Sequence, residues 1–382
     1  MARVPRVVLV GAGHTHTGVL TRLRHQRRPV FHVTCVTDHA LAAYSGMLPG
    51  VLGGQYPRSL MEIDLASMCA SAGAELIVGQ VEHINLIQCH IRFTDGRTLP
   101  FDVLSIGVGS VPSMDDVEMT APEQVVPTKP MQTFLDRLDA GLDRVIGSRV
   151  TSELAIAVVG GGLGSIELAC ALAPHVRARH GAHLALRVTL VTRDSRLSAD
   201  LAPSTARRVA RALESRGVSV VTAARVTRVA DGALELADGR RVPSALTVWA
   251  TGATAPPILR TLDVPHDARG FVLTNATLRA HLDPPVFAVG DAGTLAEDPS
   301  PKAGVYAVRQ TDVLWHNLHA VIDGRPLRTF TPQRSFLRLI NTGDGRAIGE
   351  WKGRSFEGRP VWRLKDRIDR RFMSRLRESP HG

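Results

Sequence analysis

Three stretches of this chain occur twice in the same order, and this repeat restricts the fold more than any other feature. In chain order the matches are VVLVGAGHTHTG (7–18) with IAVVGGGLGSIE (156–167), VTCVTD (33–38) with VTLVTR (188–193), and FTDGRTLPFDVLSIGVGS (93–110) with LADGRRVPSALTVWATGA (236–253). The last pair aligns without a gap. Because similarity in a fixed order indicates a repeated architecture, we predict two copies of one structural unit.

Each copy begins with an apolar strand that leads into Gly-x-Gly. The first glycine, Gly11 or Gly160, allows a tight turn, and the second, Gly13 or Gly162, lets a pyrophosphate approach the backbone. The helix that follows offers its N-terminal amides and its dipole to that phosphate. A second strand then ends near the residue that contacts the ribose, and a DG hairpin leads to a buried strand ending in glycine. We therefore predict an α/β fold with two Rossmann-type dinucleotide-binding units.

The third glycine of the G-x-G-x-x-G pattern is absent from both copies. His16 replaces it in the first copy and Ser165 replaces it in the second. This glycine normally permits close packing of helix on strand, so a histidine there must splay the helix or point away from the strand. His14, Thr15 and His16 lie on the first helical turn, where some of them can face a bound cofactor. The alternative is that His16 is a hydrogen-bonded histidine at a packing boundary.

The second strands of the two copies end in opposite charges, Asp38 and Arg193. An acid at this place hydrogen-bonds ribose hydroxyls, whereas an arginine accepts a 2′-phosphate. Thr37 and Thr192 occupy the positions aligned with the usual acid. The arginine at position 193, in place of an acid such as Asp38, favours NADP(H) over NAD(H) in the second site.

A further motif, PVFAVGDAG at 285–293, occurs once. Asp291 follows Gly290 at the carboxyl end of an apolar strand, which suits a polar hydroxyl of a cofactor close to a helix N-terminus. An ordinary helix N-cap explains the same aspartate.

Composition limits the other function classes. The longest apolar runs are strand-sized, far short of the roughly 20 residues that cross a membrane, and the N-terminus is a poor signal peptide, so we expect a cytoplasmic protein. The net charge of +10 is nearly all arginine, with four lysines, and we expect no nucleic-acid partner. The cysteines show no C-x-x-C pair and no zinc-type spacing, so we expect buried structural thiols and no metal site. They are Cys35, Cys69, Cys89 and Cys170.

Taken together, VGAGHTH, LSIGVGS, VVGGGLGSIELA, VWATGA and FAVGDAG resemble the FAD-dependent pyridine nucleotide-disulfide oxidoreductases, in particular the type II NADH dehydrogenase and sulfide:quinone reductase branch. GHTH, YSGMLPG, PKAGVYAVRQ and WRLKDRIDRRFM are most similar to the flavoprotein module found ahead of selenide, water dikinase. The resemblance covers nearly the whole chain. It implies a glutathione reductase-like fold, with an FAD domain at 1–118 and 267–328, an NAD(P)H domain at 119–266, and a C-terminal segment at 329–382.

The resemblance also implies FAD and NAD(P)H as cofactors and carries over their contacts. For FAD these are Gly11, Gly13, His14, Thr15, Thr37, Asp38, Pro49, Val81, Gly109, Gly290, Asp291, Lys302 and Ala303. For NAD(P)H they are Gly160, Gly162, Leu163, Gly164, Glu167, Arg193 and Gly252.

Two residues receive catalytic roles from the resemblance. Lys302 would lie at the pyrimidine end of the flavin, where a cation stabilises negative charge on its reduced form. Glu167 would reach toward the nicotinamide. By spacing alone, Glu167 is equally well a first-turn acid that complements the helix dipole.

The chain departs from the family pattern at the electron acceptor. Neither the redox cysteine pair of disulfide reductases nor the separated cysteines of sulfide oxidisers is present, and Arg309 and Gln310 replace the paired glutamines near the quinone. We therefore expect an FAD-dependent NAD(P)H oxidoreductase with a small-molecule or quinone acceptor and no cysteine relay. The alternatives are an oxidoreductase of sulfur or selenium species linked to quinone, and a redox sensor that binds FAD and NAD(P)H without turnover.

Residues 361–376 predict an amphipathic helix with arginines around its apolar face. That face comprises Val361, Leu364, Ile368, Phe372 and Leu376. Such a helix can bind the inner face of an anionic membrane, pack on the protein, or form a homodimer interface. Asp366 and Asp369 interrupt the basic surface, which favours packing.

Overall fold

The structure is a computed structural model that describes residues 3–26, 30–147 and 153–377. Its first large sheet has the strand order β22-β23-β9-β1-β2-β5, and all neighbours are parallel except β22 and β23. The strands are β1 (Arg6–Val10), β2 (His32–Thr37), β5 (Glu75–Val78), β9 (Val103–Ile106), β22 (Arg279–His281) and β23 (Val286–Ala288). Two segments far apart in the chain, 6–106 and 279–288, therefore build one sheet.

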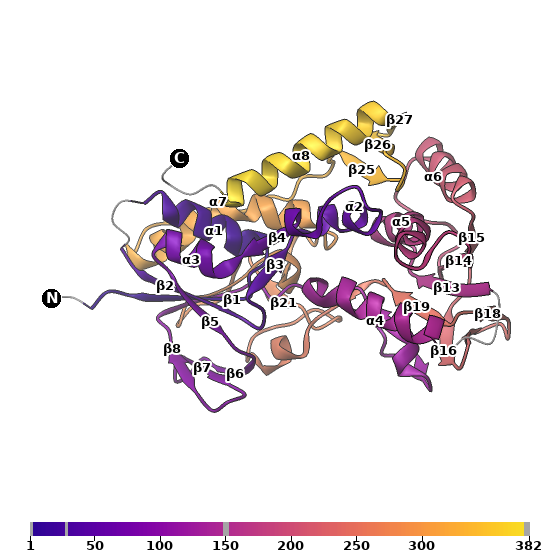
Figure 1. Cartoon of the computed structure of the whole chain (residues 1–382). Coiled ribbons are helices and arrows are strands. Elements are labelled where there is room, and N and C mark those ends of the chain that lie inside the picture. Colours follow the sequence, from indigo (N-terminus) through magenta and orange to yellow (C-terminus); the bar gives the residue numbers. More distant parts are fainter. Residues whose placement is uncertain (1–2, 27–29, 148–152, 378–382) are drawn as a thin grey trace.

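The second large sheet has the order β12-β19-β13-β14-β15 and is parallel throughout. Its strands are β12 (Val125–Pro127), β13 (Glu153–Val159), β14 (Ala185–Val191), β15 (Val218–Val221) and β19 (Leu246–Trp249). In both sheets the strand before the glycine loop lies between the other two repeated strands, so β9-β1-β2 corresponds to β19-β13-β14. This arrangement confirms the predicted α/β fold with two Rossmann-type units, which form the two lobes in Figure 1.

The helices lie mainly on the sheet faces (Figure 1). They are α1 (His14–Arg24), α2 (Leu48–Leu52), α3 (Leu65–Ala72), α4 (Phe134–Gly147), α5 (Leu163–His180), α6 (Pro203–Ser215), α7 (Gly304–Ile322) and α8 (Arg359–Arg377). Short 3-10 turns are η1 (Ser45–Met47), η2 (Arg58–Leu60), η3 (Pro122–Gln124), η4 (Met131–Thr133), η5 (Pro257–Thr261) and η6 (Gly290–Ala292). Helices α1 and α5 follow the two glycine loops directly, as the repeat predicts.

Small sheets complete the lobes. They comprise β3 (Leu41–Ala43) with β4 (Glu62–Asp64); β6 (Val81–Asn85), β7 (His90–Phe93) and β8 (Thr98–Pro100); β10 (Val111–Pro112) with β20 (Ala253–Thr254); β11 (Glu118–Met119), β16 (Val226–Ala230), β17 (Ala233–Leu236) and β18 (Arg241–Pro243); β21 (Val272–Thr274) with β24 (Gly293–Leu295); and β25 (Arg338–Asn341), β26 (Ala347–Trp351) and β27 (Arg354–Gly358). The two DG turns join β7 to β8 and β17 to β18, with Gly96 and Gly239 at positive φ. The predicted domain boundaries, at residues 118/119, 266/267 and 328/329, remain predictions.

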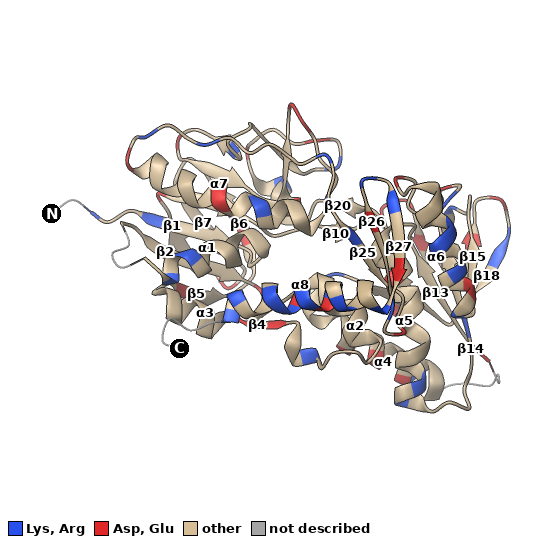
Figure 2. Cartoon of the chain, turned by 90° about the horizontal axis from the view of Figure 1, so that it is seen from above, with Lys and Arg blue, Asp and Glu red and all other residues tan. Residues whose placement is uncertain are grey.

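Helix α8 bridges the two lobes and packs on the protein (Figure 1). The predicted apolar face is only partly correct: Val361 and Leu376 are buried and Phe372 is half-buried, but Leu364 and Ile368 are 41% and 43% exposed. The buried side of the helix includes Lys365 and Asp369 instead, because these two charges pair with each other. Arginines are spaced along the exposed side (Figure 2). Within the described residues, no helix has the length and apolar character needed to cross a membrane.

Candidate functional site

A cavity of about 720 Å³ lies at the carboxyl ends of β1, β2, β9 and β23. This edge of an open parallel sheet is where dinucleotides bind in Rossmann-type folds. The cavity brings together most of the residues predicted for FAD. Those that line it are Gly11, Gly13, His14, Thr15, Thr37, Asp38, Val81, Gly109, Gly290 and Asp291.

The glycine loop brings the backbone close to the neighbouring strand. Gly11 has φ +87°, and a Cβ on it would lie 2.6 Å from the carbonyl oxygen of Gly107. A Cβ on Gly13 would lie 2.9 Å from the same atom. Helix α1 begins at His14, and in the described chain no side chain caps its first turn. Its first amides are therefore available to an anion, which fits the pyrophosphate of FAD.

His16 fills the space between α1 and β9. Its ring is fully buried, with Nδ1 2.5 Å from the carbonyl oxygen of Gly11 and Nε2 2.8 Å from the hydroxyl of Ser105. A Cβ on Gly107 would meet the imidazole at 2.8 Å. The ring points toward β9, where Ser105 and Gly107 leave room, and these contacts fit the alternative of a hydrogen-bonded histidine at a packing boundary. Burial lowers the pKa of His16 to about 4.

Asp291 projects into the cavity from η6 and has two partners that the sequence did not indicate. Its Oδ2 accepts a hydrogen bond of 2.7 Å from Ser110 and lies 3.2 Å from Nζ of Lys129. Burial alone would raise the pKa of Asp291, but the charge of Lys129 and the hydrogen bond from Ser110 outweigh it and lower that pKa. Two features of the sequence could have identified Lys129: it is one of only four lysines, and it follows the short apolar stretch that forms β12.

Three residues predicted for FAD do not line this cavity. Pro49 is buried within α2. Lys302 and Ala303 line a separate small pocket, which shares Gly290 and Asp291 of η6 with the cavity. Nζ of Lys302 donates to the carbonyl of Gly293 at 2.6 Å and to the hydroxyl of Thr294 at 2.8 Å, and burial lowers the pKa of this lysine to about 8.

The second glycine loop has the same construction as the first. Helix α5 begins at Leu163 after Gly162, and a Cβ on Gly160 would lie 2.2 Å from the carbonyl oxygen of Ala250. The hydroxyl of Ser165, at the position of His16, donates to this carbonyl at 3.0 Å. Gly162 and Gly164 border open space.

The charged residues predicted for NAD(P)H lie apart from each other. Arg193 follows β14 with 81% of its side chain exposed. Glu167 is half-buried on α5, where its Oε1 accepts a hydrogen bond of 2.7 Å from the amide of Asn341. Burial raises the pKa of Glu167 to about 7, although Lys365 opposes the shift. Gly252 lies just before β20. Within the described chain, none of the residues predicted for NAD(P)H lines the large cavity.

A polar cluster under α8, which the sequence did not indicate, joins this helix to the segment that follows β3 in the first lobe. The hydroxyl of Tyr44 donates to Oδ1 of Asp369 at 3.0 Å, and Nζ of Lys365 contacts Oδ2 of Asp369 and the carbonyl of Gly46, each at 2.7 Å. The ring of His14 lies 5.4 Å from that of Tyr44. This cluster therefore adjoins the first turn of α1 at the cavity.

The cysteines lie outside the cavity. Cys35, Cys69 and Cys170 are buried and Cys89 is half-buried. None of the four is among the described residues that line the cavity.

Comparison with known proteins agrees with this geometry. The family model described as pyridine nucleotide-disulphide oxidoreductase matches residues 5–311. Demethylphylloquinone reductase NdbB of Synechocystis is 33% identical over 183 residues, which is 46% of this chain and 43% of that protein. The chain thus matches less than half the length of this relative.

Two solved structures share the fold. NDH2 from Plasmodium falciparum, in complex with NADH, superposes with a TM-score of 0.81 at 11% identity and covers 97% of both chains. The sulfide:quinone oxidoreductase from Aquifex aeolicus superposes with a TM-score of 0.77 at 16% identity, covering 98% of this chain and 91% of that one. With its doubled dinucleotide fold and its matched residues, the chain belongs to the pyridine nucleotide-disulphide oxidoreductase family of FAD- and NAD(P)H-binding enzymes.

Proposed function

We propose that this chain is an FAD-dependent NAD(P)H oxidoreductase that delivers electrons to a quinone. The observation that carries the proposal is the pair of equivalent glycine loops, one beside a large cavity and one beside an open surface, each followed by an uncapped helix. Two dinucleotides with distinct roles require two such sites.

The residues of the first site fit FAD. The turn at Gly11 and Gly13 and the first amides of α1 would hold the pyrophosphate, and Thr37, Asp38 and Val81 mark the adenosine end. Asp291 would bind a ribityl hydroxyl. When bound, FAD accepts hydride from NAD(P)H and passes electrons on, and the protein contributes orientation and charge.

The second loop would hold NAD(P)H. The guanidinium of Arg193 is 81% exposed, with only a loose ion pair to Asp194 at 3.9 Å, and would reach a 2′-phosphate, which favours NADPH. Glu167 would lie near the nicotinamide side, and a pKa of about 7 lets it hold or release a proton at neutral pH. Lys302 would act on the flavin indirectly, since its ammonium is committed to Gly293 and Thr294.

A quinone acceptor is supported by the Synechocystis relative, which is a demethylphylloquinone reductase. Arg309 and Gln310 stand where the family has paired glutamines. Arg309 is exposed, whereas Oε1 of Gln310 accepts a hydrogen bond of 2.6 Å from the amide of Gly290. Gln310 therefore supports η6, which carries Asp291. The exposed side of α8 is the proposed surface for peripheral contact with the inner face of a membrane, or for a second copy of the chain.

The test is anaerobic stopped-flow reduction of the FAD-loaded protein by NADH and by NADPH. We expect bleaching of the flavin at a catalytic rate, followed by reoxidation with a quinone. Failure of both nucleotides to reduce the flavin would leave the redox-sensor alternative. Reduction by sulfide or selenide instead, with loss of activity in Cys→Ser variants, would favour the sulfur or selenium alternative.

A further inference from the structure

Lys129, which belongs to the segment between the two lobes, brings a positive charge to the lining of the cavity. Among the described residues that line the cavity, Lys129 is the one lysine or arginine, whereas Asp38, Glu82 and Asp291 are acids. Lys129 lies two residues beyond β12, the edge strand of the second sheet. Its side chain nevertheless reaches the first lobe, where Nζ contacts Ser110 and Asp291.

The position of Lys129 within the cavity indicates which part of FAD it serves. The carboxyl end of β2 and the beginning of β6 lie at the predicted adenosine end, and the first amides of α1 are predicted to bind the pyrophosphate. The turn η5, which contacts β6, belongs to the adenosine end, and the remaining part of the cavity is lined mainly by β3, by Lys129 with η4, and by Asp291. This part is left for the flavin ring and the ribityl chain.

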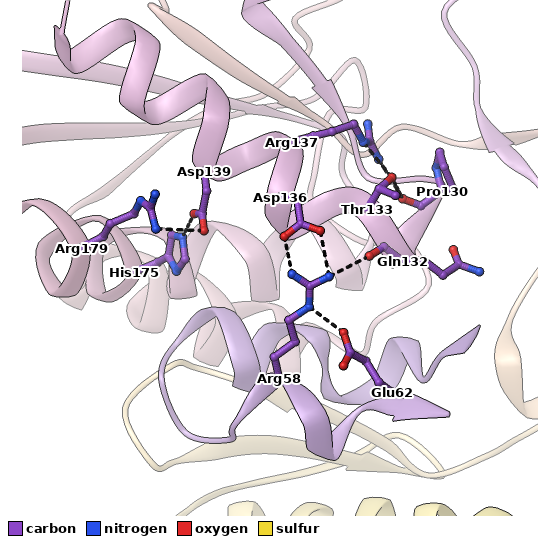
Figure 3. A network of polar contacts seen from close by, with 10 residues as sticks. All are labelled: Arg58, Glu62, Pro130, Gln132, Thr133, Asp136, Arg137, Asp139, His175 and Arg179. Carbon is purple, nitrogen blue, oxygen red and sulfur yellow. Dashed lines mark hydrogen bonds and ion pairs between the residues drawn. The ribbon is translucent and has the colours of Figure 1, made fainter. Parts of the chain in front are cut away.

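Two arginines hold the segment that carries Lys129 (Figure 3). Arg58 donates to the carbonyl of Gln132 at 3.2 Å and to Asp136 at 2.9 Å, while its Nε donates to Glu62 at 2.6 Å. Arg58 comes from η2 of the first lobe, so it ties that lobe to the start of α4.

The second arginine acts from α4. Arg137 donates to the carbonyl of Pro130 at 2.8 Å and to the hydroxyl of Thr133 at 3.1 Å (Figure 3). The carbonyls on both sides of Met131 are therefore occupied, and the backbone next to Lys129 is held in one place.

We propose that Lys129 is a residue of the FAD site that stabilises the reduced flavin electrostatically, and that Arg58 is the positioning residue that holds it there. The proposal rests on the proposed function, because it takes the cavity as the FAD site. A cation beside a group that gains negative charge on reduction favours the reduced form. In a site shielded from water this attraction is stronger than in solution.

The test is the midpoint potential of the bound flavin, measured by dithionite titration against a reference dye, with the FAD dissociation constant measured separately by fluorescence. Lys129→Met should shift the potential to more negative values and weaken FAD binding about tenfold, as expected for loss of a charged hydrogen-bonding partner. Arg58→Met should shift the potential in the same direction by a smaller amount. Dithionite does not depend on NAD(P)H, so the result is independent of whether NAD(P)H reduces the flavin.

Two controls match these variants. Lys352→Met removes an exposed lysine from the turn between β26 and β27, and should change neither value. Arg179→Met breaks the ion pairs to Asp139 and Asp143 on α4, which lie away from the segment of Lys129, and should leave the potential unchanged.

The outcomes separate the proposal from its rivals. A Lys129→Met protein that binds FAD more weakly at an unchanged potential would overturn it, because Lys129 would then serve only the phosphates. If Lys129→Met retains no FAD, Lys129→Arg is measured instead. Restored FAD binding with a midpoint potential near that of the wild type supports a role of the positive charge. Equal loss of FAD in Lys129→Arg overturns the proposal. An unchanged potential in Arg58→Met would remove Arg58 from the proposal.

Discussion

Nε2 of His16 lies 2.8 Å from the hydroxyl of Ser105 and thereby connects the first turn of α1 to β9. Nδ1 of the same ring faces the carbonyl of Gly11, which can only accept a hydrogen bond, so Nδ1 carries the proton and Nε2 accepts from Ser105. The neutral ring is thus built into the turn where the usual pattern has glycine.

Acid should destabilise the protein through His16. Its pKa of about 4 in the folded chain lies below the ordinary 6.5, so the unfolded chain takes up the proton first and stability falls as the pH drops from 6.5 to 4. The loss should reach about 3 kcal/mol, and His14, whose pKa is also lowered, adds to it. Urea unfolding at pH 7, 6 and 5 measures this. His16→Gln should flatten the dependence, whereas His183→Gln, at an exposed site, should not.

His16→Gly tests the role of the ring in the cofactor site. Removing a buried, doubly hydrogen-bonded side chain should cost about 2 to 5 kcal/mol of stability and lower the FAD content of the purified protein. Full FAD content with unchanged flavin reduction would show that His16 is a packing variant without influence on the site.

Gly11→Ala should abolish FAD binding. The new methyl group would lie 2.6 Å from a backbone oxygen in a backbone conformation that favours glycine, so the turn must move. The ratio of flavin to protein absorbance after purification measures the loss. Gly96→Ala is the matched control, because Gly96 has nearly the same φ, +86°, with open space around it. This control should lose about 1 kcal/mol of stability and keep its FAD.

Glu167 should make the protein less stable as the pH rises. Its pKa of about 7 lies above the ordinary 4.5, so the unfolded chain releases the proton first and stability falls between pH 4.5 and 7. Glu167→Gln keeps an acceptor for the amide of Asn341 and should be about 1 to 3 kcal/mol more stable than the wild type at pH 8. Unfolding by urea at pH 5 and pH 8 tests this, and an equal fall in both proteins would contradict it.

Lys365 should be needed for docking of α8. Lys365→Ala leaves the carboxylate of Asp369 buried without its cation, which should cost about 3 to 5 kcal/mol. Arg367→Ala, two residues away on the exposed side of the same helix, should change stability by less than about 0.5 kcal/mol. Similar values for the two variants would show that the pair under α8 is not a determinant of stability.

Arg193→Ala should reduce a preference for NADPH. Loss of the guanidinium should lower kcat/KM for NADPH about tenfold and leave the value for NADH nearly unchanged. Steady-state kinetics with both nucleotides measure the ratio, and Arg196→Ala serves as a control on the same loop. An unchanged ratio would remove Arg193 from the choice of nucleotide.

The repeat was sufficient to predict the two Rossmann-type units, because the matched stretches consist of strands, glycine turns, the first turns of α1 and α5, and hairpins, whose conformations depend on local residues. Gly11, Gly13, Gly160 and Gly162 lie at the predicted turns. The apolar spacing of residues 361–376 was less informative, since it identified the helix but not the side that packs. Lys365 and Asp369 are buried there because each neutralises the other, and spacing of apolar residues cannot show this.

The sequence by itself determined the fold class, the two glycine loops and the succession of repeated strands along the chain, since periodicity and turn residues act over a few neighbours. Only the tertiary structure decided which distant side chains share a site. Lys129 and Asp291 are 162 residues apart in the chain, and they meet because β23 joins the first sheet beside β9 while the segment after β12 crosses back over it. The space for His16 depends in the same way on Ser105 of β9 and on Gly107, which directly follows that strand. Such contacts depend on how the chain returns to a sheet, which no local pattern records.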